Sequence, residues 1–170
     1  MTGSDDHYSR TVTAGKGTRF ARCGFNDRFD PLRLSGIPRL RRLYENMFVE
    51  FLGESPCGML LDIGCGSGIY FEALAPRAGS VHGVDSSPEM IAVARAFCRE
   101  RRLDHFLAVA GSAERLPYPA DTFDTVIAMD VLHHVPSADQ VLDEVYRVLK
   151  PGGTFFVFEP NILNPLVWCA

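Results

Sequence analysis

Short, nearly uninterrupted apolar runs alternate along the chain with stretches in which apolar residues recur every three or four positions. The runs predict strands at residues 59–63, 80–84, 106–110, 124–129 and 154–158. The wider spacing predicts helices at residues 69–74, 88–102 and 140–149. Strands that are apolar on both faces are typical of a parallel sheet covered by helices. The sequence therefore predicts an α/β fold with helices on both faces of a parallel sheet.

The predicted helices carry apolar stripes that face the core. A further helix begins near Pro38 and stops at Gly53, since proline suits a first helical turn and glycine suits its end. Its stripe is Leu40, Leu43, Tyr44, Met47, Phe48, Phe51 and Leu52. The stripe of helix 140–149 is Val141, Leu142, Val145, Val148 and Leu149. We expect a mobile tail at residues 1–24, a helical cap at 25–56 and the main domain at 57–170.

Composition narrows the class of protein. The 170 residues are 46% hydrophobic and 22% charged, which excludes disorder or a coiled coil as a description of the whole chain. A net charge of −4 disfavours a nucleic-acid-binding module, and the longest apolar runs have strand length, so no membrane span is expected. Five cysteines without C-x-x-C or zinc spacing predict reduced thiols, a cytoplasmic location and no metal site.

The strongest local feature is the loop LDIGCGSG at residues 61–68, directly after a predicted strand and before a predicted helix. Glycines allow a sharp turn and a close approach of a ligand to the backbone. A dinucleotide fingerprint, G-x-G-x-x-G, would need its third glycine where this chain has Ile69, and the phosphate-binding loop ending in Gly-Lys-Ser/Thr is absent. A nicotinamide oxidoreductase is therefore disfavoured.

Asp85 lies at the predicted tip of the second strand, where a carboxylate can accept hydrogen bonds from both hydroxyls of a ribose. The alternative is that Asp85, Ser86 or Ser87 caps the helix that begins at Pro88. The two roles are compatible when a serine is the cap.

Four segments in this order resemble the motifs of class I S-adenosylmethionine-dependent methyltransferases: LDIGCGSG, GVDSSPEM, GSAERLPYPADTFDTVIAMDVLHHV and LKPGG. The resemblance is to the group that includes ubiquinone/menaquinone-type and other small-molecule methyltransferases, and it covers about residues 57–160. It implies a Rossmann-like sheet that is usually seven-stranded. We expect this chain to lack the last two strands, which leaves strand 154–158 as an exposed edge open to self-association or a partner chain.

The resemblance also implies a site for S-adenosylmethionine at the carboxyl ends of the strands. Its residues are Asp62, Gly64, Cys65, Gly66, Gly68, Asp85, Ser86, Met90, Ser112, Ala113, Met129 and His133. The glycine loop and Asp62 surround the methionine part, with Cys65 inside this loop as a small packing group. Asp85 holds the ribose, and Ser86, Met90, Ser112 and Ala113 lie beside the adenine. The segment from Met129 to His133 borders the methyl group.

One residue departs from the family pattern. The family commonly has aspartate where this chain has Ser112, so the charge that assists its bond to the adenine amino group is missing. No catalytic residue is assigned. His133 is a weak candidate for a general base, and Asp130 or Glu159 could contact substrate. A metal is not expected at His133 and His134, because adjacent side chains diverge.

The predicted function is transfer of a methyl group from S-adenosylmethionine to a small-molecule acceptor, with S-adenosylhomocysteine as the product. The sequence leaves open which molecule is the acceptor, and whether oxygen, nitrogen or carbon is methylated. The alternative is a non-catalytic or truncated S-adenosylmethionine-binding module that acts with a partner chain.

Overall fold

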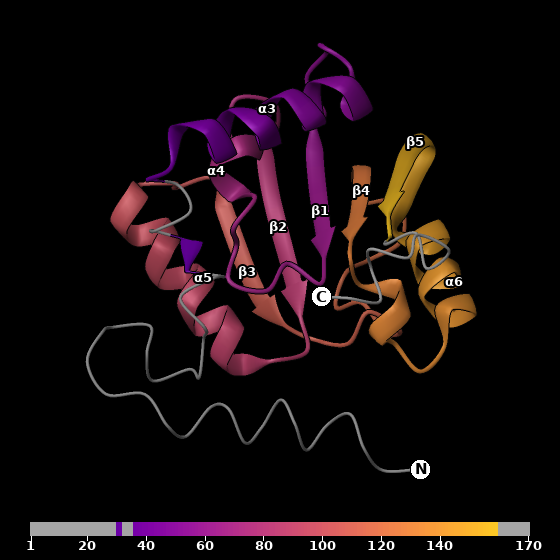
Figure 1. The fold of residues 1–170 in the computed structure, drawn as a ribbon. Helices are drawn as coiled ribbons and strands as arrows, with labels where there is room; N and C mark the ends of the chain where they lie inside the picture. Colours follow the sequence, from indigo (N-terminus) through magenta and orange to yellow (C-terminus); the bar gives the residue numbers. More distant parts are fainter. Residues whose placement is uncertain (1–29, 32–35, 160–170) are drawn as a thin grey trace, which may run out of the picture.

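The computed structural model describes residues 30–31 and 36–159, so the expected tail at 1–24 lies outside the described residues (Figure 1). The strands are β1 Met59–Ile63, β2 Ser80–Asp85, β3 Phe106–Ala110, β4 Phe123–Met129 and β5 Leu149–Phe158. The helices are α3 Pro38–Leu52, α4 Phe71–Leu74, α5 Pro88–Arg101 and α6 Ala138–Val148, with the 3-10 turn η3 Leu132–His134.

The five strands form one sheet in the order β3-β2-β1-β4-β5, and every neighbouring pair is parallel. The chain first builds outward from β1 to β3 and then continues on the other side of β1 with β4. Ligands of open α/β sheets bind at such a reversal of strand order, beyond the carboxyl ends of the strands. The predicted parallel sheet is confirmed, and its switch point lies between β1 and β4.

Helices cover both faces of the sheet, as predicted, and each face has its own apolar core. On one face α3, α4 and α5 enclose a core that includes Phe48, Phe71 and Phe97. On the other face α6 contributes Val141, Val145 and Val148. Figure 1 shows α6 beside β4 and β5, on the opposite side of the molecule from α5.

Local chemistry places the ends of α5 and α6. Pro88 occupies the first turn of α5, and the Ser87 hydroxyl caps it by accepting a hydrogen bond from the Met90 N–H at 3.2 Å. Ser137 caps α6 in the same way, accepting from the Gln140 N–H at 3.3 Å. The cap of α5 is thus a serine, which leaves the Asp85 carboxylate available for another role.

Some expected details were wrong. The helix expected at 69–74 begins only at Phe71, and β5 begins at Leu149 rather than 154. Leu43, Phe51 and Leu142 were expected in the core, yet 60%, 36% and 44% of their surfaces are exposed. Each is one helical step from a residue that packs inward, and one step turns a side chain by about 100°. The inward stripes are therefore narrower than the sequence pattern suggests.

Within the described residues, β5 is an edge of the sheet, with β4 as its one neighbour. Its last residues Val157 and Phe158 are 50% and 47% exposed. The Phe158 ring contacts Phe51 of α3, with centroids 6.2 Å apart. The exposed edge expected from the sequence is present in this part of the chain.

Candidate functional site

The loop after β1 is packed on one side and open on the other. Gly64 and Gly66 have φ angles of +70° and +51°, in the left-handed region where glycine is favoured. A Cβ at Gly64 would lie 2.3 Å from a methyl carbon of Val131, whereas a Cβ at Gly66 would meet no atom within 4 Å. The backbone at Gly66 is therefore accessible to a ligand, while Gly64 lets the loop lie close to the segment after β4.

Asp85 connects the end of β2 to this loop. One carboxylate oxygen accepts a hydrogen bond from the Gly66 N–H at 2.9 Å, and the other accepts from the Ser87 N–H at 2.9 Å. A carboxylate can accept about four hydrogen bonds. Asp85 is only partly buried, so both oxygens can accept a further donor from a ligand. This geometry suits a pair of neighbouring hydroxyls.

Asp62 is the unusual group of the site. Its side chain is 1% exposed, and neither carboxylate oxygen has a hydrogen-bond partner among the described residues. Burial, reinforced by the nearby negative charge of Asp85, raises the pKa of Asp62 well above its ordinary value. Buried polar groups are normally paired, and an unpaired one calls for an explanation. A cationic group bound nearby would stabilise the ionised form of Asp62.

The Cys65 thiol turns away from the open side of the loop. It is buried, and a Cβ at Gly83 of β2 would lie 2.6 Å from its sulfur. Burial raises the pKa of this thiol well above its ordinary value, so it remains uncharged. Only the backbone of Cys65 is left to face a ligand, in keeping with the expected packing role of its side chain.

The residues expected beside an adenine lie at the same edge of the sheet. Ser86 is exposed at the end of β2, and Met90 is buried in the first turn of α5. Ser112 and Ala113 follow β3, and the Gly111 N–H before them donates to the Asp85 carbonyl oxygen at 2.9 Å. The exposed Ser112 hydroxyl accepts from the Glu114 N–H at 3.1 Å.

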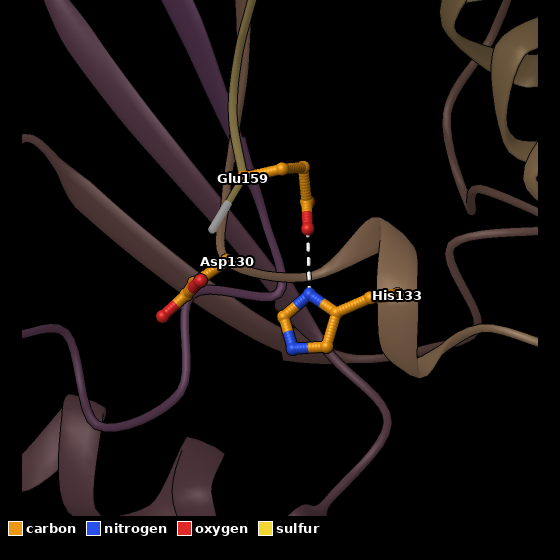
Figure 2. A group of neighbouring side chains, drawn as sticks. All are labelled: Asp130, His133 and Glu159. Carbon is orange, nitrogen blue, oxygen red and sulfur yellow. Dashed lines mark hydrogen bonds and ion pairs between the residues drawn. The ribbon is translucent and has the colours of Figure 1, made fainter. Parts of the chain in front are cut away.

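A second polar group lies where β4 and β5 end (Figure 2). Met129, the last residue of β4, is buried, and Asp130 after it is exposed, with a φ angle of +62°. Glu159, directly after β5, reaches across to η3. One of its oxygens accepts from the N–H groups of Val131 and Leu132 at 3.0 and 2.7 Å, and the other lies 2.5 Å from His133 Nδ1.

The carboxyl group of Glu159 is kept ionised by these donors. Burial alone would raise its pKa, but the hydrogen bonds from His133 and from the two backbone N–H groups outweigh burial and lower it. The sequence pointed to Glu159 and His133 one by one, as residues able to contact substrate or act as a base. It carried no signal for their contact, because 26 residues separate them.

Asp130, His133 and Glu159 each offer a ligand-type atom, and these atoms lie within 4.8 Å of one another. Hydrogen bonds account for the positions of Glu159 and His133, since one Glu159 oxygen accepts two backbone N–H groups and the other faces the imidazole. The rings of His133 and His134 do not diverge as expected, because their centroids are 3.9 Å apart. The absence of a metal stays a prediction.

A hollow of about 390 Å³ lies elsewhere, lined by Leu52, Cys57, Gly58, Asp124 and Phe156 among others. It opens at the amino ends of β1 and β4, opposite the glycine loop, and contains none of the expected site residues. No helix in the described part of the chain has the length and apolar character needed to cross a membrane.

Comparisons with known proteins agree with this geometry. Residues 61–157 match a family described as a methyltransferase domain. The chain is 33% identical over 163 residues to a ubiquinone biosynthesis O-methyltransferase of Chelativorans sp. (strain BNC1), covering 89% of this chain and 64% of that protein. It is 40% identical over 104 residues to a demethylmenaquinone methyltransferase of Anoxybacillus flavithermus, covering 59% and 44%.

Among solved structures, the YcgJ protein of Bacillus subtilis has a similar fold, with a TM-score of 0.65 and 30% identity. The match covers 74% of this chain and 54% of that one. The chain spans between 40% and 64% of the length of the first curated relatives that it matches. Since the family match covers more than half of the chain and the fold agrees with it, this chain belongs to the class I S-adenosylmethionine-dependent methyltransferases.

Proposed function

We propose that this chain binds S-adenosylmethionine at the carboxyl ends of its strands and transfers the methyl group to a small-molecule acceptor. The observation that carries this proposal is the pair of carboxylates at the glycine loop. Asp85 holds the loop through the Gly66 N–H and can accept further donors, while the buried Asp62 has no partner in the described structure. A ligand with a ribose and a positively charged end suits both groups.

The residues present fit the cofactor part by part. Asp85 would accept from the ribose hydroxyls, and the open backbone at Gly66 would face the methionine part. Asp62 lies near the start of the loop, where an ammonium group would offset its charge. Ser86, Met90, Ser112 and Ala113 would enclose the adenine, and Met129 and His133 would border the methyl group.

When bound, S-adenosylmethionine supplies a methyl group on a positively charged sulfur, which is a strong leaving group. The protein therefore has to orient donor and acceptor and exclude water, rather than activate the leaving group. Val131, whose side chain lies against Gly64, provides apolar surface beside the loop for this purpose. A base is needed only where the acceptor must lose a proton.

The test is isothermal titration calorimetry of the purified chain with S-adenosylmethionine and with S-adenosylhomocysteine. We expect saturable binding of both, below millimolar concentration. Absence of heat from either ligand at millimolar concentration, for a chain shown to be folded by circular dichroism, would overturn the proposal.

We also propose that the β5 edge associates with a second copy or a partner chain. The half-exposed Val157 and Phe158 on an edge strand support this, because free edges offer unpaired backbone groups to another strand. Replacing Val157 with lysine should shift the sedimentation of the purified chain from a larger species to the monomer. A wild-type chain that sediments as a monomer at every concentration would contradict self-association.

A cytoplasmic location is our proposal as well. It is supported by Cys57, Cys65 and Cys98, which are all free in the described part of the chain, as expected in a reducing compartment. Fractionation of cells that express the tagged chain would test it, and recovery from the membrane or secreted fraction would contradict it.

A further inference from the structure

We propose that the β5 edge pairs with the β5 edge of a second copy of this chain, in antiparallel orientation across a two-fold axis. This inference rests on the association proposed above for β5, and it names the partner and the register. The pairing involves residues 154–158, the part of β5 whose register with β4 is regular. The two five-stranded sheets then become one continuous sheet.

The two edges of the sheet, β3 and β5, differ in how they are protected. The His105 carbonyl oxygen accepts from the Val81 N–H of β2, so the Ala108 carbonyl, an odd number of residues further on, points away from β2. Arg95 of α5 covers this outward oxygen with a hydrogen bond of 2.7 Å. Charged groups commonly protect an edge in this way. Residues 154–158, TFFVF, contain neither a charge nor a proline, so β5 is the unprotected edge of the described sheet.

The backbone groups on the β5 edge match those of an identical strand. The Asp130 N–H donates to the Phe158 carbonyl oxygen at 2.7 Å, so the backbone of Phe158 faces β4. Alternate residues of a strand direct their N–H and C=O groups to opposite sides, so those of Phe155 and Val157 face the edge. A second β5 that runs the opposite way pairs all of these groups when Phe155 of one copy lies opposite Val157 of the other.

This register also brings compatible side chains together. Phe156 lies at the two-fold axis and meets its own copy on the α3 side of the sheet. Phe155 and Val157 of opposite copies meet on the α6 side. Aromatic and β-branched pairs across two strands stabilise a sheet, whereas like charges directly opposite each other destabilise it. Because residues 154–158 are uncharged, nothing in the strand repels its own copy.

One flank of α6 extends the contact surface above the edge. Arg147 donates to the Tyr118 carbonyl oxygen, and the Tyr118 ring lies against His82 of β2. Successive residues of a helix turn by about 100°, so Leu142 and Tyr146 lie on the other flank, away from β2. Since β2 and β5 are on opposite sides of β1 and β4, this flank faces the β5 edge. Leu142 and Tyr146 are 44% and 86% exposed.

The opposite face of the sheet has an apolar border too, where the Phe158 ring contacts Phe51 of α3. Five of the nine large hydrophobic side chains exposed in the described part of the chain therefore lie along one edge: Phe51, Leu142, Tyr146, Val157 and Phe158. Contiguous exposed apolar surface of this kind marks an interaction site. In a two-fold dimer each surface meets its own copy, so the same strip covers both partners.

The first experiment is sedimentation equilibrium of the full chain over a range of concentrations, where we expect monomer and dimer. Val157→Lys should raise the dissociation constant of the dimer at least about ten-fold, and Tyr146→Ala at least about five-fold. Leu107→Lys is the matched control, because Leu107 is 46% exposed on the protected strand β3, and it should dimerise as the wild type does. A wild type that is monomeric at every concentration, or an equal loss in the control, would overturn the proposal.

The second experiment tests the register by disulfide formation. Thr154 of one copy lies opposite Phe158 of the other in a non-hydrogen-bonded pair, whose Cα atoms are about 4.5 Å apart, within reach of a disulfide. After mild oxidation, a mixture of Thr154→Cys and Phe158→Cys chains should give a cross-linked dimer on a non-reducing gel. Either variant alone should show no more than the background of the wild type with its five native cysteines. No cross-link in the mixture, or an equal one in a single variant, would overturn the antiparallel register.

Calorimetry with S-adenosylmethionine separates this inference from the proposed methyl transfer. Val157→Lys should bind the cofactor with the affinity of the wild type, because Val157 is not among the expected cofactor contacts. A wild type that binds S-adenosylmethionine and stays monomeric overturns the dimer alone. A wild type that dimerises and cross-links as expected, yet binds no S-adenosylmethionine, overturns the proposed methyl transfer and supports the dimer.

Discussion

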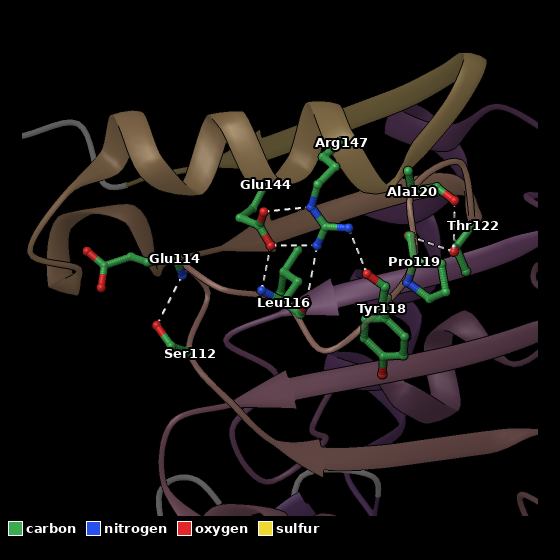
Figure 3. A network of polar contacts seen from close by, with 9 residues as sticks. All are labelled: Ser112, Glu114, Leu116, Tyr118, Pro119, Ala120, Thr122, Glu144 and Arg147. Carbon is green, nitrogen blue, oxygen red and sulfur yellow. Dashed lines mark hydrogen bonds and ion pairs between the residues drawn. The ribbon is translucent and has the colours of Figure 1, made fainter.

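Two groups of polar side chains in this protein differ in how completely their atoms are paired by hydrogen bonds. Beside α6, Glu144 and Arg147 make hydrogen bonds to each other and to the segment before β4 (Figure 3). At the glycine loop, the buried Asp62 has no hydrogen-bond partner among the described residues. The first arrangement stabilises the chain as it stands, whereas the second costs free energy until something binds.

The α6 network shows how completely the first region is paired. Arg147 donates to the carbonyl oxygens of Tyr118 and Leu116 at 2.8 and 3.2 Å, and Glu144 accepts from the Leu116 N–H at 2.7 Å. The hydrogen bond from Arg147 is the main reason why the pKa of Glu144 is lowered. These bonds hold the 116–118 segment against the helix, away from the expected cofactor contacts at Asp85 and Gly66.

The largest effect on the affinity for S-adenosylmethionine is expected at Asp85. Replacing Asp85 with alanine removes two acceptors for the ribose, each worth about 1.5–3 kcal/mol, so the affinity for S-adenosylmethionine should fall at least about 100-fold. Calorimetry measures the change. Asp104→Ala, an exposed aspartate at the amino end of β3, is the control and should bind as the wild type does. An Asp85 variant with unchanged affinity would place the ribose elsewhere.

Arg147 should show the reverse behaviour. Arg147→Met keeps the apolar stem but removes the bonds to Leu116, Tyr118 and Glu144, which should lower the free energy of unfolding by about 1–3 kcal/mol. Urea titration followed by circular dichroism measures this loss. The affinity for S-adenosylmethionine should stay within about two-fold of the wild type. A large loss of binding in a folded variant would show that the α6 network and the glycine loop are not independent.

Asp62 should link binding to pH. A carboxyl whose pKa is raised on folding contributes stability that is complete below its unfolded pKa and is lost as pH rises through the folded value. Asparagine does not titrate, so the variant Asp62→Asn does not suffer this loss. The free energy of unfolding of the variant, compared with that of the ligand-free wild type, should therefore increase from acidic to neutral pH. Urea titrations at several pH values test this. The same variant should bind S-adenosylmethionine about 10-fold less tightly. A parallel pH dependence of the two chains would show that Asp62 does not titrate on folding.

The smallest effect is expected at Ser112. Ser112→Asp introduces the acidic group that the family commonly has, and its charge should strengthen the bond to the adenine amino group. We expect a gain in affinity of about three- to ten-fold by calorimetry, with little change in stability because Ser112 is exposed. Ala120→Asp, at an exposed turn outside the expected cofactor site, distinguishes a specific bond from a general change in charge, and an equal gain there would favour the general effect.

The sequence by itself determined most of the architecture. The strand β1 and its loop were predictable, because a strand-length apolar run and the spacing of Gly64, Gly66 and Gly68 are local properties of the sequence. The order of the motifs identified the family. The bounds of β3 at Phe106–Ala110 agree with the predicted strand. The ends of α4 and β5 were not predictable, because the loop before Phe71 and the pairing of Leu149 with Phe123 depend on neighbours distant in the chain.

Only the tertiary structure decided which polar groups are paired. Nothing around Asp62 in the sequence indicates that its carboxylate has no partner, since this depends on the burial that β2 and β4 impose on β1. The contact of Glu159 with His133 likewise arises because parallel strands bring the ends of β4 and β5 to one edge. Periodicity and glycine spacing are local properties, whereas burial and hydrogen-bond pairing belong to the assembled sheet.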